Sequence, residues 1–173
     1  MFSKISIISL IFSLAFCHAL LAQKSSKLQM EVGASLNGGL YEEYPVWGYG
    51  GYGKLLWTIG RKGNALITGI DFSRLHERYY DERYAYNYLL SSFGFRKIRK
   101  SFFVEFKAGI GAFNDEDYFS PCVFIGIEPG IQKDKLIFSL DYRFLTSEGL
   151  IDGSYFNTVA LKFSYKIMRN KNN

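Results

Sequence analysis

The sequence predicts an all-β protein, a closed antiparallel barrel of eight strands in up-and-down order. Three observations support this fold. Eight runs of alternating apolar and other residues follow one another along the chain after its first 27 residues. Most of these runs are longer than the five or six residues usual in soluble proteins. The connections between the runs alternate between longer and shorter segments.

Each run is defined by alternation, because successive side chains of a strand point to opposite faces. In the segment SFFVEFKAGIGAF, one face is wholly apolar and the other carries Glu105 and Lys107. The fourth run is mixed on both faces, which predicts a bulge or a shifted register. Pro129 predicts a local bulge in the sixth run, because proline donates no ladder hydrogen bond. The runs cover residues 28–37, 47–59, 66–73, 84–95, 101–113, 123–131, 136–144 and 159–167.

The connections differ in charge as well as in length. The long ones are residues 38–45, 75–83, 114–120 and 145–154, and they hold ten acids against two bases. The short ones are residues 60–64, 96–100 and 132–135, and with the C-terminal tail they hold ten bases against one acid. Short turns at one end and longer loops at the other are typical of outer-membrane barrels, which predicts a transmembrane barrel.

The charged faces are predicted to point into the barrel. They hold five acids and five bases, and such a balance suits a closed interior, where charges must be paired. Most of the strand glycines share these faces and make room for long side chains. The predicted lumen network consists of Glu31, Lys54, Asp71, Glu105, Lys107, Glu128, Asp141, Arg143, Lys162 and Lys166.

The apolar faces are predicted to contact lipid. Trp47 and Trp57 lie ten residues apart on one such face, a rise of roughly 25 Å that matches the apolar band between two aromatic girdles. The predicted girdle residues are Trp47, Tyr49, Trp57, Tyr142, Phe163 and Tyr165. A secreted, soluble, lipocalin-like binding barrel is the alternative, and it would turn these faces inward.

The first 22 residues have the pattern of a signal peptide. Lys4 supplies the positive charge, residues 5–16 form an apolar run, and Ala22 precedes the cleavage point. Residues 23–173 then form the barrel domain, which we expect to be exported to the bacterial outer membrane. Cys17 lies within the signal segment, and Phe16 before it disfavours a lipoprotein. Cys122 is then the single cysteine of the mature chain, so no internal disulfide forms.

The sequence resembles the small eight-stranded outer-membrane barrels of the OmpX and OmpA-barrel group, and the outer-membrane β-barrel domain proteins of Bacteroidetes. The segments FFVEFKAGIGAF, FIGIEPGIQKDKLIFSLDYRF and NTVALKFSYKI carry this resemblance, which covers residues 27–167. It implies a monomer inserted into outer-membrane lipid by the barrel-assembly machinery. Such barrels usually end on an aromatic residue, whereas here KIMRNKNN follows Tyr165. FSRLHERYYDERYAYNYLL is similar to the barrels of conjugative transfer systems.

No catalytic, metal or cofactor site is predicted. His76 and Ser73 are three residues apart, so on a strand they face opposite sides, and the His–Ser spacing of lipid-A deacylase barrels is absent. The net charge of +5 is not gathered into a nucleic-acid-binding motif. The predicted role is structural, or recognition of an unknown partner through the long loops. A lipid-modifying enzyme and a conjugative-transfer barrel are the further alternatives.

Overall fold

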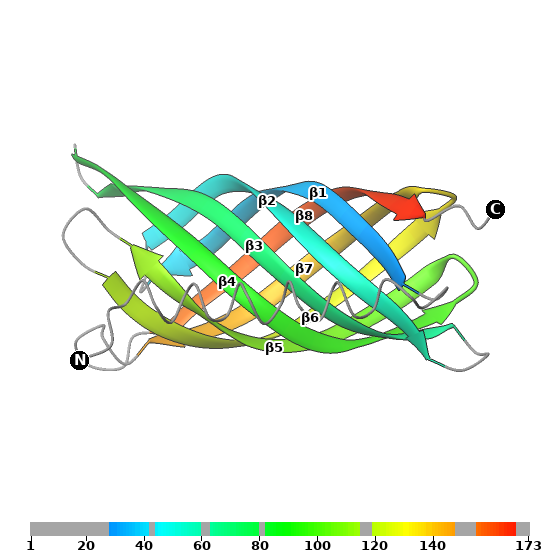
Figure 1. The fold of residues 1–173 in the computed structure, drawn as a ribbon. Helices are drawn as coiled ribbons and strands as arrows, with labels where there is room; N and C mark the ends of the chain where they lie inside the picture. Colours follow the sequence, from blue (N-terminus) through cyan, green and yellow to red (C-terminus); the bar gives the residue numbers. More distant parts are fainter. Residues whose placement is uncertain are drawn as a thin grey trace.

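The computed structural model describes residues 28–41, 44–59, 63–79, 82–114, 119–147 and 155–168, so the predicted signal peptide lies outside the described residues. Eight strands account for nearly all of this part of the chain (Figure 1). They are β1 (Leu28–Tyr41), β2 (Tyr44–Ile59), β3 (Asn64–Tyr79), β4 (Glu82–Arg99), β5 (Phe102–Asn114), β6 (Phe119–Lys133), β7 (Leu136–Ser147) and β8 (Tyr155–Met168). None of the described residues forms a helix long and apolar enough to cross a membrane.

Each strand pairs antiparallel with its neighbours, and β8 pairs with β1, which closes the barrel as predicted. The register shows how far the strands are staggered. Following paired residues once around the barrel leads from Leu28 back to β1 at Gly38, a shift of ten residues (38 − 28). For eight strands this stagger gives a tilt of about 40° and a climb of about 25 Å along the barrel axis.

The alternation in sequence becomes an inner and an outer face. Each of the eight strands exposes at least one large apolar side chain on the outside, for example Leu36, Trp47 and Phe106. The alternate positions point into the lumen and are largely buried. The barrel therefore has an apolar exterior, and its buried polar and charged side chains lie inside.

The strands extend further than the sequence predicts. Residues 38–45 and 75–83 were expected to be long loops, but β1 to β4 continue to Tyr41, Tyr44, Tyr79 and Glu82. This end of the barrel, called the loop end below, carries the β1–β2, β3–β4, β5–β6 and β7–β8 connections, and β3 and β4 extend furthest of the strands there (Figure 1). The opposite end is called the turn end. At the turn end, the prediction of a turn over residues 96–100 is also wrong. Strand β4 continues to Arg99, and only residues 100–101 separate it from β5.

Neither predicted bulge is present. The β3–β4 and β4–β5 registers run without a shift along β4, so the fourth strand is continuous. Its mixed pattern arises because Tyr88 and Leu90 point into an apolar part of the lumen. At Pro129 the β6–β7 ladder is interrupted, but Ile127↔Tyr142 and Gly130↔Ser139 share one register, so no residue is inserted. The missing proline N–H explains this gap without a bulge.

The lumen is layered along its axis. A buried apolar cluster fills the loop end, formed by Val46, Leu75, Tyr88, Leu90, Cys122, Phe124, Leu145 and Phe156. A smaller one near the turn end consists of Leu56, Ala65 and Ile67. The predicted polar filling therefore lies on the turn-end side of the loop-end cluster, and the smaller cluster lies beside its last charges, since Ala65 pairs with Arg96. Cys122 is a buried member of the first cluster, in keeping with a packing role.

Candidate functional site

Charged side chains that meet in the middle of the lumen are the most distinctive feature of the barrel. We call them the lumen belt. Each is at most 5 % exposed. Charges so deeply buried are normally paired, because an isolated one is expensive to desolvate. The lumen belt consists of Glu31, Lys54, Asp71, Arg96, Glu105, Lys107, Glu128, Asp141, Arg143, Lys162 and Lys166.

Arg96 organises the part of the lumen belt nearest the turn end. Its guanidinium binds both carboxylate oxygens of Glu31 at 2.5 and 2.9 Å, which joins β4 to β1 across the lumen. Its Nε and Nη2 also donate to Oε2 of Glu105 at 3.0 and 2.7 Å. A single planar cation thus satisfies two carboxylates, the kind of bidentate recognition to which arginine is suited.

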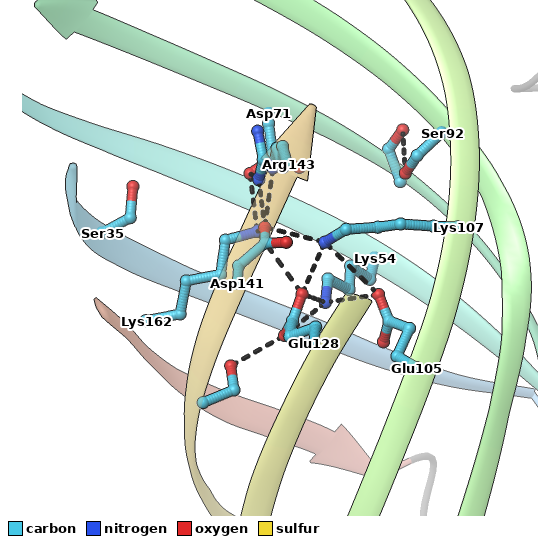
Figure 2. Close-up of polar contacts among 12 residues, drawn as sticks. Ser35, Lys54, Asp71, Ser92, Glu105, Lys107, Glu128, Asp141, Arg143 and Lys162 are labelled. Atoms are coloured by element: carbon cyan, nitrogen blue, oxygen red, sulfur yellow. Dashed lines mark hydrogen bonds and ion pairs between the residues drawn. The ribbon is translucent and has the colours of Figure 1, made fainter. Parts of the chain in front are cut away.

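Glu128 occupies the centre of the lumen belt (Figure 2). Lys54 donates to both of its oxygens at 2.8 and 2.7 Å, and also reaches Glu105 Oε1 at 2.9 Å. Lys107 Nζ lies 2.6 Å from Glu128 Oε2, and the Ser139 hydroxyl donates to Oε1 at 2.7 Å. The Glu128 carboxylate therefore links charges from β2, β5 and β6.

Asp141 and Asp71 complete the lumen belt toward the loop end. Asp141 Oδ2 accepts from Lys107 at 2.7 Å and lies 2.9 Å from Lys162 Nζ. Arg143 binds both aspartates, and its Nη2 lies 2.7 Å from Asp71 Oδ1. Lys162 also donates to Asp71 Oδ1 at 2.8 Å. The contacts form one connected network from Glu31 on β1 to Lys162 on β8.

The structure places all ten sequence-predicted lumen residues on the inner face and adds Arg96, which the sequence analysis assigned to a turn. With Arg96, the lumen belt holds six bases against five acids. Lys166 is the least engaged of the bases, and its hydrogen bond is to Gln132 Oε1 at 3.4 Å. It faces Glu31 directly across β1–β8, but the Glu31 carboxylate is bound to Arg96.

Aromatic rings border the lumen belt. The Arg96 guanidinium lies 4.2 Å from the centroid of Phe103 near the turn end, and that of Arg143 lies 5.8 Å from Phe124 near the loop end. Lys162 Nζ is 4.2 Å from the Tyr52 centroid. Such cation–π contacts are strongest where the cation is desolvated, as these buried side chains are. The lumen belt is therefore bordered by an aromatic side chain toward each end of the barrel.

The six predicted girdle residues all lie on the outer face. Trp47 and Tyr49 are near the loop end, and Trp57 and Tyr165 are near the turn end. By register, Tyr142 and Phe163 lie between the two ends of the apolar exterior. The Tyr142 hydroxyl donates to Asn157 Oδ1 at 3.0 Å.

No catalytic pair is formed by Ser73 and His76. Both lie on β3, where Ser73 points into the lumen and accepts from Asn37 Nδ2 at 3.0 Å. His76 points outward, and its ring centroid lies 5.3 Å from that of Trp47. The barrel wall separates the two side chains. In the described part of the chain, no group of three His, Cys, Asp or Glu residues is arranged to hold a metal ion.

Comparison with solved structures identifies the same class of fold. The chain is similar to Ail, the attachment invasion locus protein of Yersinia pestis, with a TM-score of 0.58 and 14% identity over 81% of this chain and 97% of Ail. It is similar to Neisserial surface protein A, with a TM-score of 0.57 and 11% identity over 84% and 98% of the two chains. The structure of Ail in a phospholipid nanodisc gives a TM-score of 0.50 at 14% identity, over 79% and 99%.

No model of a known protein family matches the sequence, and no curated protein matches it. The protein therefore has the fold of the small eight-stranded outer-membrane barrels. The finer resemblance to the OmpX group and to Bacteroidetes proteins remains a prediction.

Proposed function

We propose that this protein is an integral β-barrel of a bacterial outer membrane, monomeric, with a structural or surface-recognition role. One observation carries the proposal: the exterior is apolar on every strand, while eleven charged side chains are buried in the lumen. In water, the exposed Leu, Ile, Val and Phe side chains would form an apolar surface much larger than soluble monomers present. In a bilayer the same surface contacts lipid, and the closed sheet leaves no unpaired edge.

A soluble lipocalin-like barrel fits this arrangement less well. Such a barrel binds an apolar ligand inside and presents polar side chains outside, the reverse of the faces seen here. Lys54, Lys107 and Glu128 meet in the position that the ligand would occupy. The predictions of a signal peptide, of assembly-machinery recognition and of residence in the outer membrane belong to the same proposal.

The test is fractionation combined with a mobility assay. After expression with its own leader in a Gram-negative host, the protein should be recovered with outer membranes, and boiling should change its mobility on a denaturing gel. Recovery from the soluble periplasmic fraction with unchanged mobility would favour the lipocalin-like alternative.

We also propose that the barrel conducts no ions. The lumen belt and the loop-end cluster together fill the cross-section with packed side chains such as Arg143 and Phe124. Purified protein in a planar lipid bilayer should therefore give no steady single-channel current above the empty-bilayer baseline. Regular conductance steps that depend on protein concentration would contradict this filled-lumen proposal.

We propose that the protein has no enzymatic activity. The observation that supports this is the placement of Ser73 inside and His76 outside the barrel wall. His76→Ala should leave the lipid A acylation profile of intact cells identical to that of cells with the unmodified protein. A change in that profile would establish the lipid-modifying alternative.

Recognition is proposed to occur at the loop end, where strands β3 and β4 extend furthest (Figure 1). A photo-crosslinking residue at position 80, in the β3–β4 connection, should capture a partner on intact cells. The matched control is position 101, in the two-residue turn at the opposite end. Equal capture from both positions would argue against a loop-end surface.

A further inference from the structure

Four outward side chains gather where β2 and β3 approach the loop end. The register places Trp47 opposite His76 and Tyr49 opposite Arg74. The His76 ring lies 5.3 Å from the Trp47 centroid and 6.2 Å from the Tyr49 centroid. These four residues, Trp47, Tyr49, Arg74 and His76, are called the interfacial patch below.

Arg74 gives the interfacial patch an uncompensated positive charge. Its side chain is exposed, and its paired neighbours are Tyr49 on β2 and Asn87 on β4, neither of which is acidic. Among the described residues no carboxylate forms an ion pair with it, whereas every lumen arginine binds two carboxylates. A guanidinium at the border of an apolar surface therefore remains available to an external anion.

We propose that the interfacial patch binds the phosphate of an anionic lipid headgroup in the outward-facing leaflet. The proposal rests on the membrane placement proposed above. At the end of the apolar exterior, Trp47 and Tyr49 are suited to the headgroup level, where aromatic rings anchor barrels. Arg74 then presents a planar set of donors that matches phosphate oxygens, and a His76 ring N–H is a further donor. Asn87 adds an amide beside Arg74.

The specificity of the interfacial patch can be tested against a matched site. Lys97 is also an exposed base on the outer face, but it lies at the turn end and is paired with Asn64 and Val104. Full-length protein in neutral detergent would be titrated with phosphatidic acid, or with phosphatidylcholine, and the bound lipid counted by native mass spectrometry. Arg74→Gln should weaken phosphatidic acid binding about tenfold or more, the effect of losing a charge-assisted hydrogen bond.

The controls define the outcomes. Lys97→Gln should leave the affinity within about twofold, and Arg74→Lys should retain part of it, because lysine keeps the charge without the planar donor set. Inorganic phosphate at millimolar concentration should fail to displace the lipid, since it gains no apolar contact. Equal affinities of Arg74→Gln and the unmodified protein, an equal loss in Lys97→Gln, or displacement by phosphate would overturn the lipid-headgroup proposal.

Boiling of the same samples before electrophoresis tests the interfacial-patch proposal separately from the membrane-barrel proposal. A variant that shows the folded mobility and lacks the binding preference contradicts the interfacial patch alone. Failure of the unmodified protein to show a heat-dependent mobility would instead contradict the membrane-barrel proposal.

Discussion

The guanidinium of Arg96 on β4 binds the carboxylate of Glu31 on β1 with two hydrogen bonds, 2.5 and 2.9 Å long, across the lumen. It also binds Glu105, so its removal would leave Glu31 without its bidentate partner and weaken the pairing of Glu105. Breaking a buried pair from one side costs about 3–5 kcal/mol. Arg96→Met should lower the free energy of unfolding by this amount, measured by urea titration of Trp fluorescence in phospholipid vesicles.

Adding Glu31→Gln to the Arg96→Met protein should restore part of the lost stability, because the stranded charge is then removed as well. An Arg96→Met protein as stable as the unmodified one would show that the turn-end part of the lumen belt does not stabilise the barrel.

Lys166→Met should behave differently although it also removes a buried base near the turn end. The hydrogen bond of Lys166 is a 3.4 Å contact to Gln132, and the structure shows no carboxylate that depends on it. We expect a change below about 1 kcal/mol, or a small gain, because a weakly paired buried cation is removed. The same urea titration measures it, and a loss as large as that of Arg96→Met would mean that Glu31 needs both bases.

The sequence analysis placed Lys166 in the lumen but assigned Arg96 to a turn. This difference shows what alternation along the sequence can and cannot reveal. Period-two alternation places Glu105 and Lys107 inside without any structure, because strand geometry ties sequence parity to a face. The same parity, continued past Phe95, places Arg96 inside, but its basic neighbours in RKIRK suggested a turn. The partners cannot be read in this way, since Arg96 and Glu31 are 65 residues apart and meet only through barrel closure.

Alternation also fails where both faces are apolar. Tyr88 and Leu90 point inward into the loop-end cluster, while Leu89 and Phe93 point outward, so β4 shows no polar face along this stretch. The loop lengths were misjudged for a related reason. Polar residues that continue a strand beyond the apolar exterior resemble loop residues when only their composition is considered.

Ile127→Arg tests the outer face at mid-depth. Ile127 is exposed and lies five of the eight pairing steps along the path from Leu28 to Gly38, so it is near the middle of the climb. An arginine on the lipid face costs about 2–4 kcal/mol at the bilayer midplane and about 0–1 near the interfaces. Ile127→Arg should therefore destabilise the barrel in vesicles by the larger amount.

Val104→Arg is the matched control, because Val104 pairs with the exposed base Lys97 near the turn end. Val104→Arg should lower the free energy of unfolding by only about 0–1 kcal/mol, the cost of an arginine near the interface. Equal and negligible costs at both positions would mean that the outer face does not contact lipid.

The hydrogen bond from Tyr142 to Asn157 tests polar pairing on the outer face. Its length is 3.0 Å, and both side chains point outward. Asn157→Ala leaves the tyrosine hydroxyl without this acceptor, and membrane hydrogen bonds contribute about 0.6 kcal/mol on average and up to about 1.7. A double-mutant cycle with Tyr142→Phe, followed by urea unfolding in vesicles, should give a coupling energy in this range. Additive effects of the two substitutions would show that the bond contributes nothing.

Two glycines with opposite surroundings test how tightly the lumen is packed. A Cβ at Gly109 would lie 2.0 Å from the Ser91 carbonyl oxygen and 2.6 Å from the Phe124 ring, whereas one at Gly53, on the outer face, would meet nothing within 4 Å. The Ser91 oxygen belongs to the backbone of β4, so it can move away only if the strands shift. Gly109→Ala should destabilise the barrel by about 1–3 kcal/mol, the cost of overpacking. Gly53→Ala should be neutral or stabilising by up to about 1 kcal/mol, because it restricts the unfolded chain. Urea midpoints in vesicles measure both, with the heat-dependent gel shift reporting the folded fraction, and a Gly109→Ala protein as stable as Gly53→Ala would contradict the close approach of β4 and Phe124 to Gly109.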